Sequence, residues 1–468
     1  MGRKRVDVLL ENITIEACAA EGKALTHWNG VVVFVPFAVP GDVVDIRVTK
    51  KSKNYYEGFV ERIVTPSKDR LEPFCQHFGV CGGCKWQPLP YPMQLEAKRQ
   101  QVYDQLVRIG HLNVPEIRPT IPSDKIQYYR NKLEFTFSSK RWLLKDEDIE
   151  SVPENDRMGL GFHVGKFFDK VLDIKHCYLQ KDPSNDIRLF IKKYAVENGL
   201  DFFDIRQNVG YVRNMFIRTT DTGDLMVIMC FFYENREDRE KMLDAIAEAF
   251  PQITSLYYII NNKLNDSIGD QECILYKGEP TIRETMESLT FRIGPKSFYQ
   301  TNSEQAYKLY SVARDFAELT GNEIVYDLYT GTGTIAQFVS GKAAKVVGIE
   351  YVPEAIEDAK VNAAGNGITN CEFFAGDMKD VLRRDFINEH GQPDVIILDP
   401  PRAGIHPDVA KVILEASPAR MVYVSCNPAS QARDLALFAD KYDITAVQPV
   451  DMFPHTQHVE NVCALRLR

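Results

Sequence analysis

Apolar and polar residues alternate along the N-terminal part of the chain, and turn-forming pairs such as Pro40-Gly41 and Lys53-Asn54 interrupt the alternation. A period of two residues is typical of strands that bury one face. The expected strands are Val6–Ala17, Gly30–Pro36, Asp42–Thr49 and Tyr55–Val64. Short strands in this arrangement predict a five-stranded β-barrel over residues 1–68, a kind of domain that often binds oligonucleotides.

The middle of the chain, residues 69–285, has shorter segments, and we expect a β-rich central domain. A run from residue 92 to 110 begins with proline, ends with glycine and has apolar residues on one face, which predicts a helix. We expect this helix to be able to pack on the C-terminal domain. The clearest strands are Lys132–Ser138 and Leu225–Phe232, and Arg236–Phe250 predicts another helix.

From residue 286 to 468, strand-like and helix-like segments alternate, which indicates a parallel sheet with helical crossovers. The predicted strands are Ile324–Leu328, Lys345–Glu350, Cys371–Ala375, Asp394–Leu398 and Met421–Ser425, and the clearest helices are Pro353–Asn366 and Pro407–Ala416. The predicted fold class of this region is therefore an α/β Rossmann-like domain. Ligands of such sheets bind outside the carboxyl ends of the strands.

The composition is that of a globular protein, with 468 residues, 44% hydrophobic and 26% charged, and this length predicts three domains. No apolar run approaches the roughly 18 to 20 residues needed to span a bilayer. We therefore expect a cytoplasmic protein with no membrane partner. The net charge of −9 argues against a protein coated in nucleic acid. Basic clusters around Lys50 and Arg130 are compatible with either a local RNA-binding patch or a solvated surface.

A glycine-rich turn, Asp327-Leu328-Tyr329-Thr330-Gly331-Thr332-Gly333, follows the first predicted strand of the C-terminal region. Gly331 and Gly333 allow the backbone to approach a ligand closely. Nucleotide and flavin binders use similar turns, so this signal alone leaves the ligand open. Glu350 ends the next strand 17 residues after Gly333, where an acidic side chain can bind ribose hydroxyls.

Two more carboxylates narrow the choice of ligand. Asp327 before the turn does not fit the dinucleotide pattern, and it could face a ligand that carries a sulfonium and an amine. Asp377 follows the third predicted strand and can reach an adenine amine. With the glycine turn and Glu350, these residues resemble the class I S-adenosylmethionine-dependent methyltransferases.

Candidate chemistry follows at the ends of the last two predicted strands. Asp399-Pro400-Pro401-Arg402 is a turn common in methyltransferases that act on nucleobases, and its fourth residue is neither aromatic nor cysteine. Cys426 ends the next strand, where Pro428 stops it. Carbon 5 of uracil is a weak nucleophile, and addition of a thiolate at carbon 6 gives it the electron density of an enolate. We therefore interpret Cys426 as a nucleophile.

A base is also required, because carbon 5 carries a proton after the methyl group has been transferred. Glu460 is the candidate, with His455 and His458 as alternatives. The two histidines lack a third ligand that would make them a metal site. A cytosine-5 methyltransferase would need a cysteine in the turn at residues 399–402, which has none.

Four cysteines, Cys75, Cys81, Cys84 and Cys177, are the candidate metal ligands. Ten cysteines in 468 residues are too few for a disulfide framework, and three cysteines within ten residues indicate ligation of a metal or a cluster. Four thiolates can hold a structural zinc ion or an iron–sulfur cluster. Because three are grouped and one stands apart, the spacing differs from that of usual structural zinc sites.

With these motifs, nearly the whole chain resembles the RNA uracil-5 methyltransferases, above all the branch that acts on 23S ribosomal RNA. The resemblance implies an N-terminal TRAM-type (OB-like) barrel, a 4Fe–4S cluster with a structural role, Cys426 as nucleophile and Glu460 as base. It places six residues around S-adenosylmethionine: Gln300, Tyr329, Thr334, Glu350, Asp377 and Asp399. At Tyr329, Thr334 and Asp377 other members can carry Phe, Asn and Asn.

The expected partner is structured RNA, with 23S ribosomal RNA favoured over transfer RNA. The target uridine has to be flipped out of its stack to reach the cysteine. We expect a monomer. A rival hypothesis is a non-catalytic iron–sulfur or zinc RNA-binding protein with a vestigial methyltransferase fold, against which the presence of Gln300, Cys426 and Glu460 argues.

Overall fold

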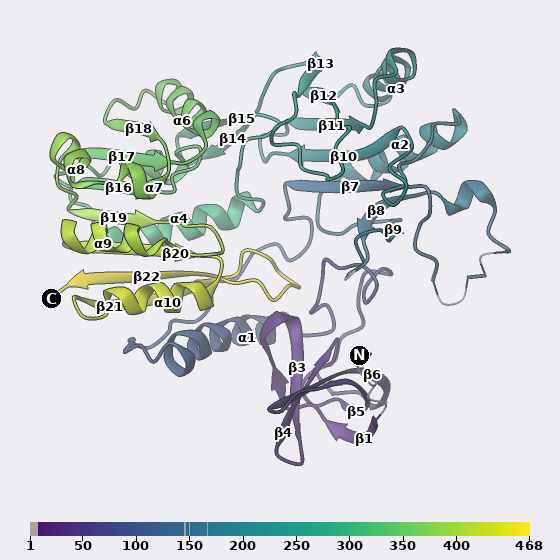
Figure 1. Ribbon diagram of the computed structural model, residues 1–468, viewed down its shortest axis with the longest axis horizontal. Helices are drawn as coiled ribbons and strands as arrows, with labels where there is room; N and C mark the ends of the chain where they lie inside the picture. Colours follow the sequence, from purple (N-terminus) through teal and green to yellow (C-terminus); the bar gives the residue numbers. More distant parts are fainter. Residues whose placement is uncertain (1–7, 145–146, 149, 166) are drawn as a thin grey trace.

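The computed structural model describes residues 8–144, 147–148, 150–165 and 167–468. Figure 1 shows a small N-terminal β-domain, a central sheet with its own helices, and a C-terminal α/β domain. Within the described ranges, every helix is too short or too polar to cross a lipid bilayer.

The N-terminal domain is one six-stranded sheet in the order β1-β5-β6-β4-β3-β2. Its elements are β1 (Val8–Thr14), β2 (Ala17–Cys18), η1 (Ala20–Gly22), β3 (Lys23–Trp28), β4 (Val31–Pro36), β5 (Val43–Lys51) and β6 (Tyr55–Thr65). The expected strand over residues 6–17 is divided between β1 and β2, and its positions 6 and 7 lie outside the described residues. The strand β3 was not expected. Asn29 and Gly30 take positive φ angles of 49° and 77° and join β3 to β4 in a tight hairpin.

The central domain is built on a seven-stranded sheet in the order β13-β12-β11-β10-β7-β8-β9. Its elements are β7 (Lys132–Ser138), η3 (Glu154–Arg157), β8 (Gly159–His163), β9 (Val171–Asp173), α2 (Ser184–Glu197), β10 (Val212–Thr219), β11 (Leu225–Phe231), α3 (Arg236–Ala249), β12 (Ser255–Ile260) and β13 (Ile274–Gly278). The predicted strand at β7 is confirmed. The predicted strand at β11 and the predicted helix at α3 agree with the structure to within one residue. Both helices pack on one face of the sheet in a shared apolar core.

Between these two domains, α1 (Tyr91–Tyr103) continues into the π-helical turn η2 (Asp104–Ile109), so the predicted helix is present. Val102 and Leu106 are fully buried and belong to the same core as Ala432 and Leu435 of the C-terminal domain. Figure 1 shows α1 lying next to α10, at the border with the N-terminal domain. The helix therefore connects the N-terminal half of the chain to the sheet that carries the predicted chemistry.

The C-terminal sheet has the order β18-β17-β16-β19-β20-β22-β21, with β16 to β20 parallel and β22 antiparallel to both of its neighbours. A separate hairpin precedes it, formed by β14 (Ile282–Met286) and β15 (Leu289–Ile293). The sheet strands are β16 (Ile324–Leu328), β17 (Lys345–Glu350), β18 (Cys371–Ala375), β19 (Val395–Leu398), β20 (Arg420–Ser425), β21 (Tyr442–Val450) and β22 (Glu460–Leu467). The helices are α4 (Ser303–Ala317), α5 (Thr334–Ser340), α6 (Pro353–Gly365), α7 (Met378–Val381), α8 (Arg384–His390), α9 (Pro407–Ala416) and α10 (Pro428–Phe438).

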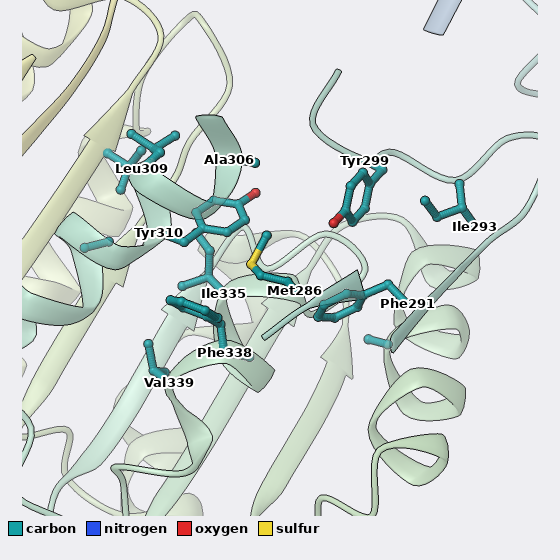
Figure 2. Close-up of a cluster of buried hydrophobic side chains, with 14 of the residues drawn as sticks. Met286, Phe291, Ile293, Tyr299, Ala306, Leu309, Tyr310, Ile335, Phe338 and Val339 are labelled. Atoms are coloured by element: carbon teal, nitrogen blue, oxygen red, sulfur yellow. The ribbon is translucent and has the colours of Figure 1, made fainter. Parts of the chain in front are cut away.

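All five predicted parallel strands are present, and the antiparallel pair β21–β22 was not predicted. Helices cover both faces of the sheet, which explains why its strands are apolar throughout. One core joins the sheet to α4, α5 and α6, and a second joins it to α8, α9, α10 and α1. Figure 2 shows part of the first core, where Tyr310 lies near Ile335 and Phe338 of α5 and Tyr299 lies near Phe291. This core supports the segment that holds Gln300.

Candidate active site and cofactor site

The glycine-rich turn connects β16 to α5 in a conformation that favours glycine. Gly333 has a φ of 74°, and a Cβ atom there would lie 2.9 Å from the Cβ of Ala359 and from the ring of Phe373. Gly331 also has a positive φ, of 55°. Tyr329 takes a φ of 67°, and its amide donates a hydrogen bond of 3.0 Å to the carbonyl oxygen of Ile349 on β17. The turn is therefore fixed to the neighbouring strand, with its backbone open on the side away from Phe373.

Asp327 lies beneath this turn and is fully buried. Its Oδ2 accepts hydrogen bonds from the Thr330 hydroxyl at 2.5 Å and the Ala336 amide at 3.0 Å, whereas its Oδ1 has no hydrogen-bond partner. Burial raises the pKa of the carboxyl to about 7. A buried acceptor without a partner is costly, so this oxygen is suited to receive a donor or a positive charge from a ligand.

Glu350 ends β17 opposite the turn. Its Oε2 accepts a hydrogen bond from the amide of Gly331 at 3.1 Å, and its Oε1 accepts one from the amide of Val352 at 3.0 Å. These bonds hold the carboxylate in one orientation at the strand end, where the predicted ribose contact would be made. Asp377 stands at the start of α7, and its carboxylate pairs with Lys379 at 3.1 Å, which lowers its pKa. Its predicted contact with adenine stays a prediction.

Gln300 lies in the segment that connects β15 of the hairpin to α4. Asn131 holds this segment, because its side chain donates to the carbonyl of Gln300 and its amide donates to that of Thr301, both at 2.8 Å. The side chain of Gln300 lies near the hydroxyl of the buried Tyr310. On the other side, the hydroxyl of Thr332 donates to the carbonyl of Phe298 at 3.4 Å and lies 3.3 Å from the hydroxyl of Thr334. The segment therefore lies against the glycine turn, and the predicted cofactor residues meet at one edge of the sheet.

Cys426 and Glu460 are neighbours at this same edge. The strands β20 and β22 pair with Ser425 opposite Asn461, so the residue after β20 and the residue that begins β22 lie side by side. Asp399 follows β19, the next strand, and interacts electrostatically with both residues. The sheet topology thus brings together the predicted nucleophile, the predicted base and the acidic turn.

These groups are shielded from water and repel one another when ionised. Burial raises the pKa of Glu460 to about 8, and the nearby Asp399 contributes to the same shift. Burial and the charge of Asp327 raise the pKa of Asp399 to about 7. The Cys426 thiol has its pKa raised to about 11, first by burial and then by Glu460. Pairs of perturbed groups at a strand edge are typical of catalytic sites.

Arg402 also lies at this edge, and the sequence pattern does not single it out as a site residue. It lies close to Cys426, and its positive charge opposes the rise in the pKa of both the thiol and Glu460. Asn427 holds its backbone, with Nδ2 donating to the Arg402 carbonyl at 3.0 Å. The sequence signal that could have indicated this residue is its positive charge in the Asp-Pro-Pro-Arg turn at residues 399–402.

The two alternative bases are placed differently. His455 is buried, its ring nitrogen lies 3.2 Å from the Gln94 amide, and burial lowers its pKa to about 4. His458 lines a cavity with Arg402, and burial followed by the charge of Arg402 lowers its pKa to about 4 as well. Both rings are neutral near pH 7. His455 serves to hold the loop, and His458 faces the cavity.

The four predicted ligand cysteines line one cavity of about 680 Å³ between the central domain and the catalytic edge. The amide of Cys177 donates to Asn185 at 2.8 Å, and that of Cys75 donates to Gln87 at 3.2 Å. Electrostatic interactions couple Cys84 to the other three thiols, and burial raises its pKa to about 12. Across the part of the chain that the structure describes, no group of three or more histidine, cysteine, aspartate or glutamate side chains is arranged to hold a metal ion. The metal site therefore stays a prediction.

The sheet order, the glycine turn and the cysteine at the strand edge define an α/β methyltransferase domain. The family model of tRNA (uracil-5-)-methyltransferases matches residues 218–468, just over half of the chain, and the TRAM domain model matches residues 3–60. The chain therefore belongs to the tRNA (uracil-5-)-methyltransferase family. This confirms the predicted family and its N-terminal TRAM domain.

Individual relatives agree with this assignment. An "uncharacterized RNA methyltransferase" of Porphyromonas gingivalis is 58% identical over 455 residues, which cover 96% of this chain and 98% of that protein. An "uncharacterized RNA methyltransferase" of Bacteroides thetaiotaomicron is 58% identical over 453 residues, which cover 96% of this chain and 100% of that protein. Among solved structures, the tRNA (uracil-54, C5)-methyltransferase of Pyrococcus abyssi in complex with S-adenosyl-L-homocysteine is 29% identical, with a TM-score of 0.74 over 97% of this chain and 100% of that chain. The predicted fold class is thereby confirmed.

Proposed function

We propose that the protein transfers a methyl group from S-adenosylmethionine to carbon 5 of a uridine in structured RNA, with Cys426 as nucleophile and Glu460 as base. The observation that carries the proposal is the juxtaposition of these two residues at the polar edge of the sheet, next to Asp399 and the glycine turn. The reaction needs a thiol and a second group that accepts a proton, and this edge supplies both. We expect a monomer that acts in the cytoplasm, where such RNA is found.

The residues around the turn fit S-adenosylmethionine. The unpaired Oδ1 of Asp327 can accept from the amino group of the ligand, and Glu350 is oriented for the ribose hydroxyls. Gly333 keeps the backbone free of a Cβ atom where the turn is most crowded. When bound, this cofactor supplies the methyl group on a sulfonium. The P. abyssi enzyme binds the demethylated product of that compound, which supports the same choice here.

The proposed chemistry uses the two neighbouring side chains in turn. The thiolate sulfur of Cys426 bonds to carbon 6 of uracil, which leaves an enolate with electron density at carbon 5. Carbon 5 then takes the methyl group as the bond from that group to the sulfonium breaks and its electron pair stays on the sulfur. Glu460 then removes the proton from carbon 5, and the electron pair of that bond re-forms the double bond as the carbon–sulfur bond breaks. Arg402 favours the thiolate through its nearby positive charge. A uridine within a stack cannot reach Cys426, so the base has to be flipped out.

We also propose that Cys75, Cys81, Cys84 and Cys177 hold a 4Fe–4S cluster with a structural role. A single zinc ion needs all its sulfur ligands at about 2.3 Å from one point, whereas a cluster binds each cysteine through a different iron. The four thiols line a common cavity, and the three grouped cysteines with one apart match the cluster motif that the resemblance implies. These two features support the cluster over zinc.

The proposed substrate is 23S ribosomal RNA, in line with the resemblance of the cysteine motif to the ribosomal branch of the family. Transfer RNA is the second candidate, since the similar P. abyssi enzyme is a tRNA (uracil-54, C5)-methyltransferase. The experiment incubates the purified protein and labelled S-adenosylmethionine with unmodified 23S ribosomal RNA or unmodified transfer RNA. Mass spectrometry of the digested RNA should reveal 5-methyluridine in the ribosomal RNA. If only transfer RNA is labelled, transfer RNA is the substrate in place of 23S ribosomal RNA. If the methyl group is found on another atom or base, the proposed reaction is wrong.

A further inference from the structure

The proposed base, Glu460, is the first residue of β22, and its position depends on the loop that precedes it. This loop, residues 451–459, connects β21 to β22. His455 in the middle of it has a positive φ of 64°, a conformation that most side chains disfavour. Most of the loop is nevertheless buried. Contacts outside the loop must therefore hold it in place.

A buried ion pair attaches the beginning of this loop to α1. The ammonium of Lys98 lies 2.5 Å from Oδ1 of Asp451, and both side chains are fully buried. Lys98 also donates to the carbonyl of Phe453 at 3.1 Å, and Asp451 accepts from the amide of Phe453 at 3.0 Å. The hydroxyl of Tyr91, the first residue of α1, donates to Oδ2 of Asp451 at 2.8 Å. All these bonds fix residues 451–453 to one face of the helix.

A second residue on the same face of α1 holds the middle of the loop. Oε1 of Gln94 accepts from the amide of His455 at 2.8 Å, and its Nε2 lies 3.2 Å from the ring nitrogen of that histidine. The carbonyl of His455 accepts from the amides of Lys85 at 2.8 Å and Trp86 at 3.0 Å. The backbone amide of His455 is therefore hydrogen-bonded to α1, and its carbonyl oxygen is hydrogen-bonded to the segment after Cys84.

A buried ion pair is poor evidence for stabilisation. Desolvation of the two charges offsets much of their attraction, and an apolar pair of the same size often stabilises a protein as well or better. A buried pair does select one arrangement, because any displacement leaves a charge without its partner. Lys98 and Asp451 are 353 positions apart in sequence, so this selection acts on how α1 and the loop dock.

We propose that Lys98 and Gln94 are positioning residues for the proton-abstraction step. Acting through Asp451 and His455, they dock the loop on α1 and so hold Glu460 where it can reach carbon 5 of the methylated uracil. They contact none of the reacting atoms themselves. This inference rests on the proposed function, since it requires that Glu460 is the base.

The test separates the step that needs Glu460 from the steps that do not. RNA with 5-fluorouridine at the target traps the enzyme after attack and methyl transfer, because fluorine cannot leave as a cation. The main variant is the double change Lys98→Met and Asp451→Asn, which leaves no unpaired charge in the protein interior. Gln94→Leu is a second variant that removes the other docking contact. Arg213→Met is the matched control, because Arg213 is also fully buried and bonds a loop, at residues 261–266 of the central domain.

The expected result is a selective loss of the last step. Both docking variants should form the fluorouridine adduct within about threefold of the wild-type rate. With normal RNA, their turnover should fall about 10- to 100-fold, because a displacement near 1 Å has this effect on a positioned group. A methylated covalent adduct should accumulate on a denaturing gel. Arg213→Met should leave the ratio of the two rates unchanged.

Failure of the inference differs from failure of the proposed function. If the wild-type protein forms no fluorouridine adduct, or Glu460→Gln does not stall as an adduct, the proposed function is wrong. If those two controls behave as expected and the folded docking variants lose adduct formation and turnover in equal proportion, the positioning role is overturned. The ratio of the two rates is measured on the folded fraction, so partial unfolding does not obscure it.

Discussion

Ser425 at the end of β20 faces Asn461 near the start of β22 across an antiparallel pair of strands. Because the two strands run in opposite directions, Cys426 leaves the sheet at the same edge at which Glu460 enters it. A parallel strand in the position of β22 would place its first residue at the opposite end of the sheet. The antiparallel insertion of β22 therefore places the proposed nucleophile and the proposed base at one edge of the sheet, where both could act on one ring.

The covalent mechanism predicts opposite results for the two catalytic residues. Cys426→Ala should abolish methylation and leave cofactor binding within about twofold of wild type, since it removes a reactive atom and little contact surface. Glu460→Gln should still attack and transfer the methyl group, and should then remain bound as a covalent protein–RNA adduct. The measurement is a denaturing gel with labelled RNA, on which the shifted band of Glu460→Gln must disappear when Cys426→Ala is added. Methylation by Cys426→Ala at the wild-type rate would exclude the mechanism.

The pKa of Glu460, raised to about 8 by burial and Asp399, predicts how the last step depends on pH. Only the ionised carboxylate can accept the proton from carbon 5, and its fraction grows about tenfold per pH unit below 8. Decay of the methylated adduct should therefore accelerate from pH 6 to about 8 and then level off, as followed by rapid quenching. Adduct formation with fluorouridine RNA depends on the thiol instead, and should still increase at pH 9. A decay rate independent of pH over this range would count against Glu460 as the base.

Gly333 offers a test of the cofactor site. Alanine at this position would combine a φ of 74° with contacts of 2.9 Å to Ala359 and Phe373, so Gly333→Ala should destabilise the fold by about 1–3 kcal/mol and weaken cofactor binding at least tenfold. Gly341→Ala is the control, since Gly341 has a negative φ of −66° and nothing within 4 Å of a Cβ atom. Denaturant unfolding and titration calorimetry with S-adenosylhomocysteine measure the two effects. Equal binding by both variants would argue against this location of the cofactor.

The iron–sulfur proposal predicts about four irons per chain in protein purified without oxygen. Cys84→Ser should lower the iron content to near zero, because each iron of the cluster needs its own thiolate. Cys371→Ser, at a half-buried cysteine of β18, should retain the iron. Metal analysis together with the visible absorption spectrum gives the answer, and one zinc without iron under these conditions would decide for the zinc alternative.

Local sequence signals predicted much of the fold and most of the polar residues at the carboxyl ends of the C-terminal strands. The parallel strands of the C-terminal sheet are short apolar runs bounded by turns, and β16, β17 and β18 begin and end where the pattern indicates. The glycine turn and the polar residues after each strand follow from the rule that ligands bind at the carboxyl ends. Local signals were sufficient to predict the parallel part of the sheet, where each strand is followed by a helix and then by the next strand.

Features that depend on distant pairing could not be predicted in this way. The insertion of β22 between β20 and β21 depends on its pairing with β20, from which α10 and β21 separate it in sequence. A buried lysine such as Lys98 looks like a solvent-exposed helix residue in sequence, since its partner Asp451 is 353 positions away. The influence of Arg402 on Cys426 likewise depends on two strand ends meeting in space.

The raised pKa of Glu460 also predicts that the catalytic base destabilises the fold. The unfolded chain releases this proton near pH 4.5, whereas the folded protein holds it up to about pH 8. Between these values the unfolded state binds fewer protons, so the stability of the folded state falls as the pH rises. Glu460 is only 5% exposed, and the neutral variant Glu460→Gln should therefore be more stable than wild type at pH 8.5, by on the order of 2–4 kcal/mol, and nearly equal to it at pH 4.5.

Urea unfolding at the two pH values measures this difference. Glu415→Gln, on the surface of α9, is the control and should leave stability within about 0.5 kcal/mol at either pH, as expected for a surface substitution. The expected gain arises because glutamine keeps the shape of the side chain and removes the cost of a buried charge. A Glu460→Gln protein that is less stable than wild type at pH 8.5 would show that the carboxylate is well compensated in the folded protein. The protein would then hold Glu460 ionised at neutral pH, and the predicted pH dependence of adduct decay would fail together with this prediction.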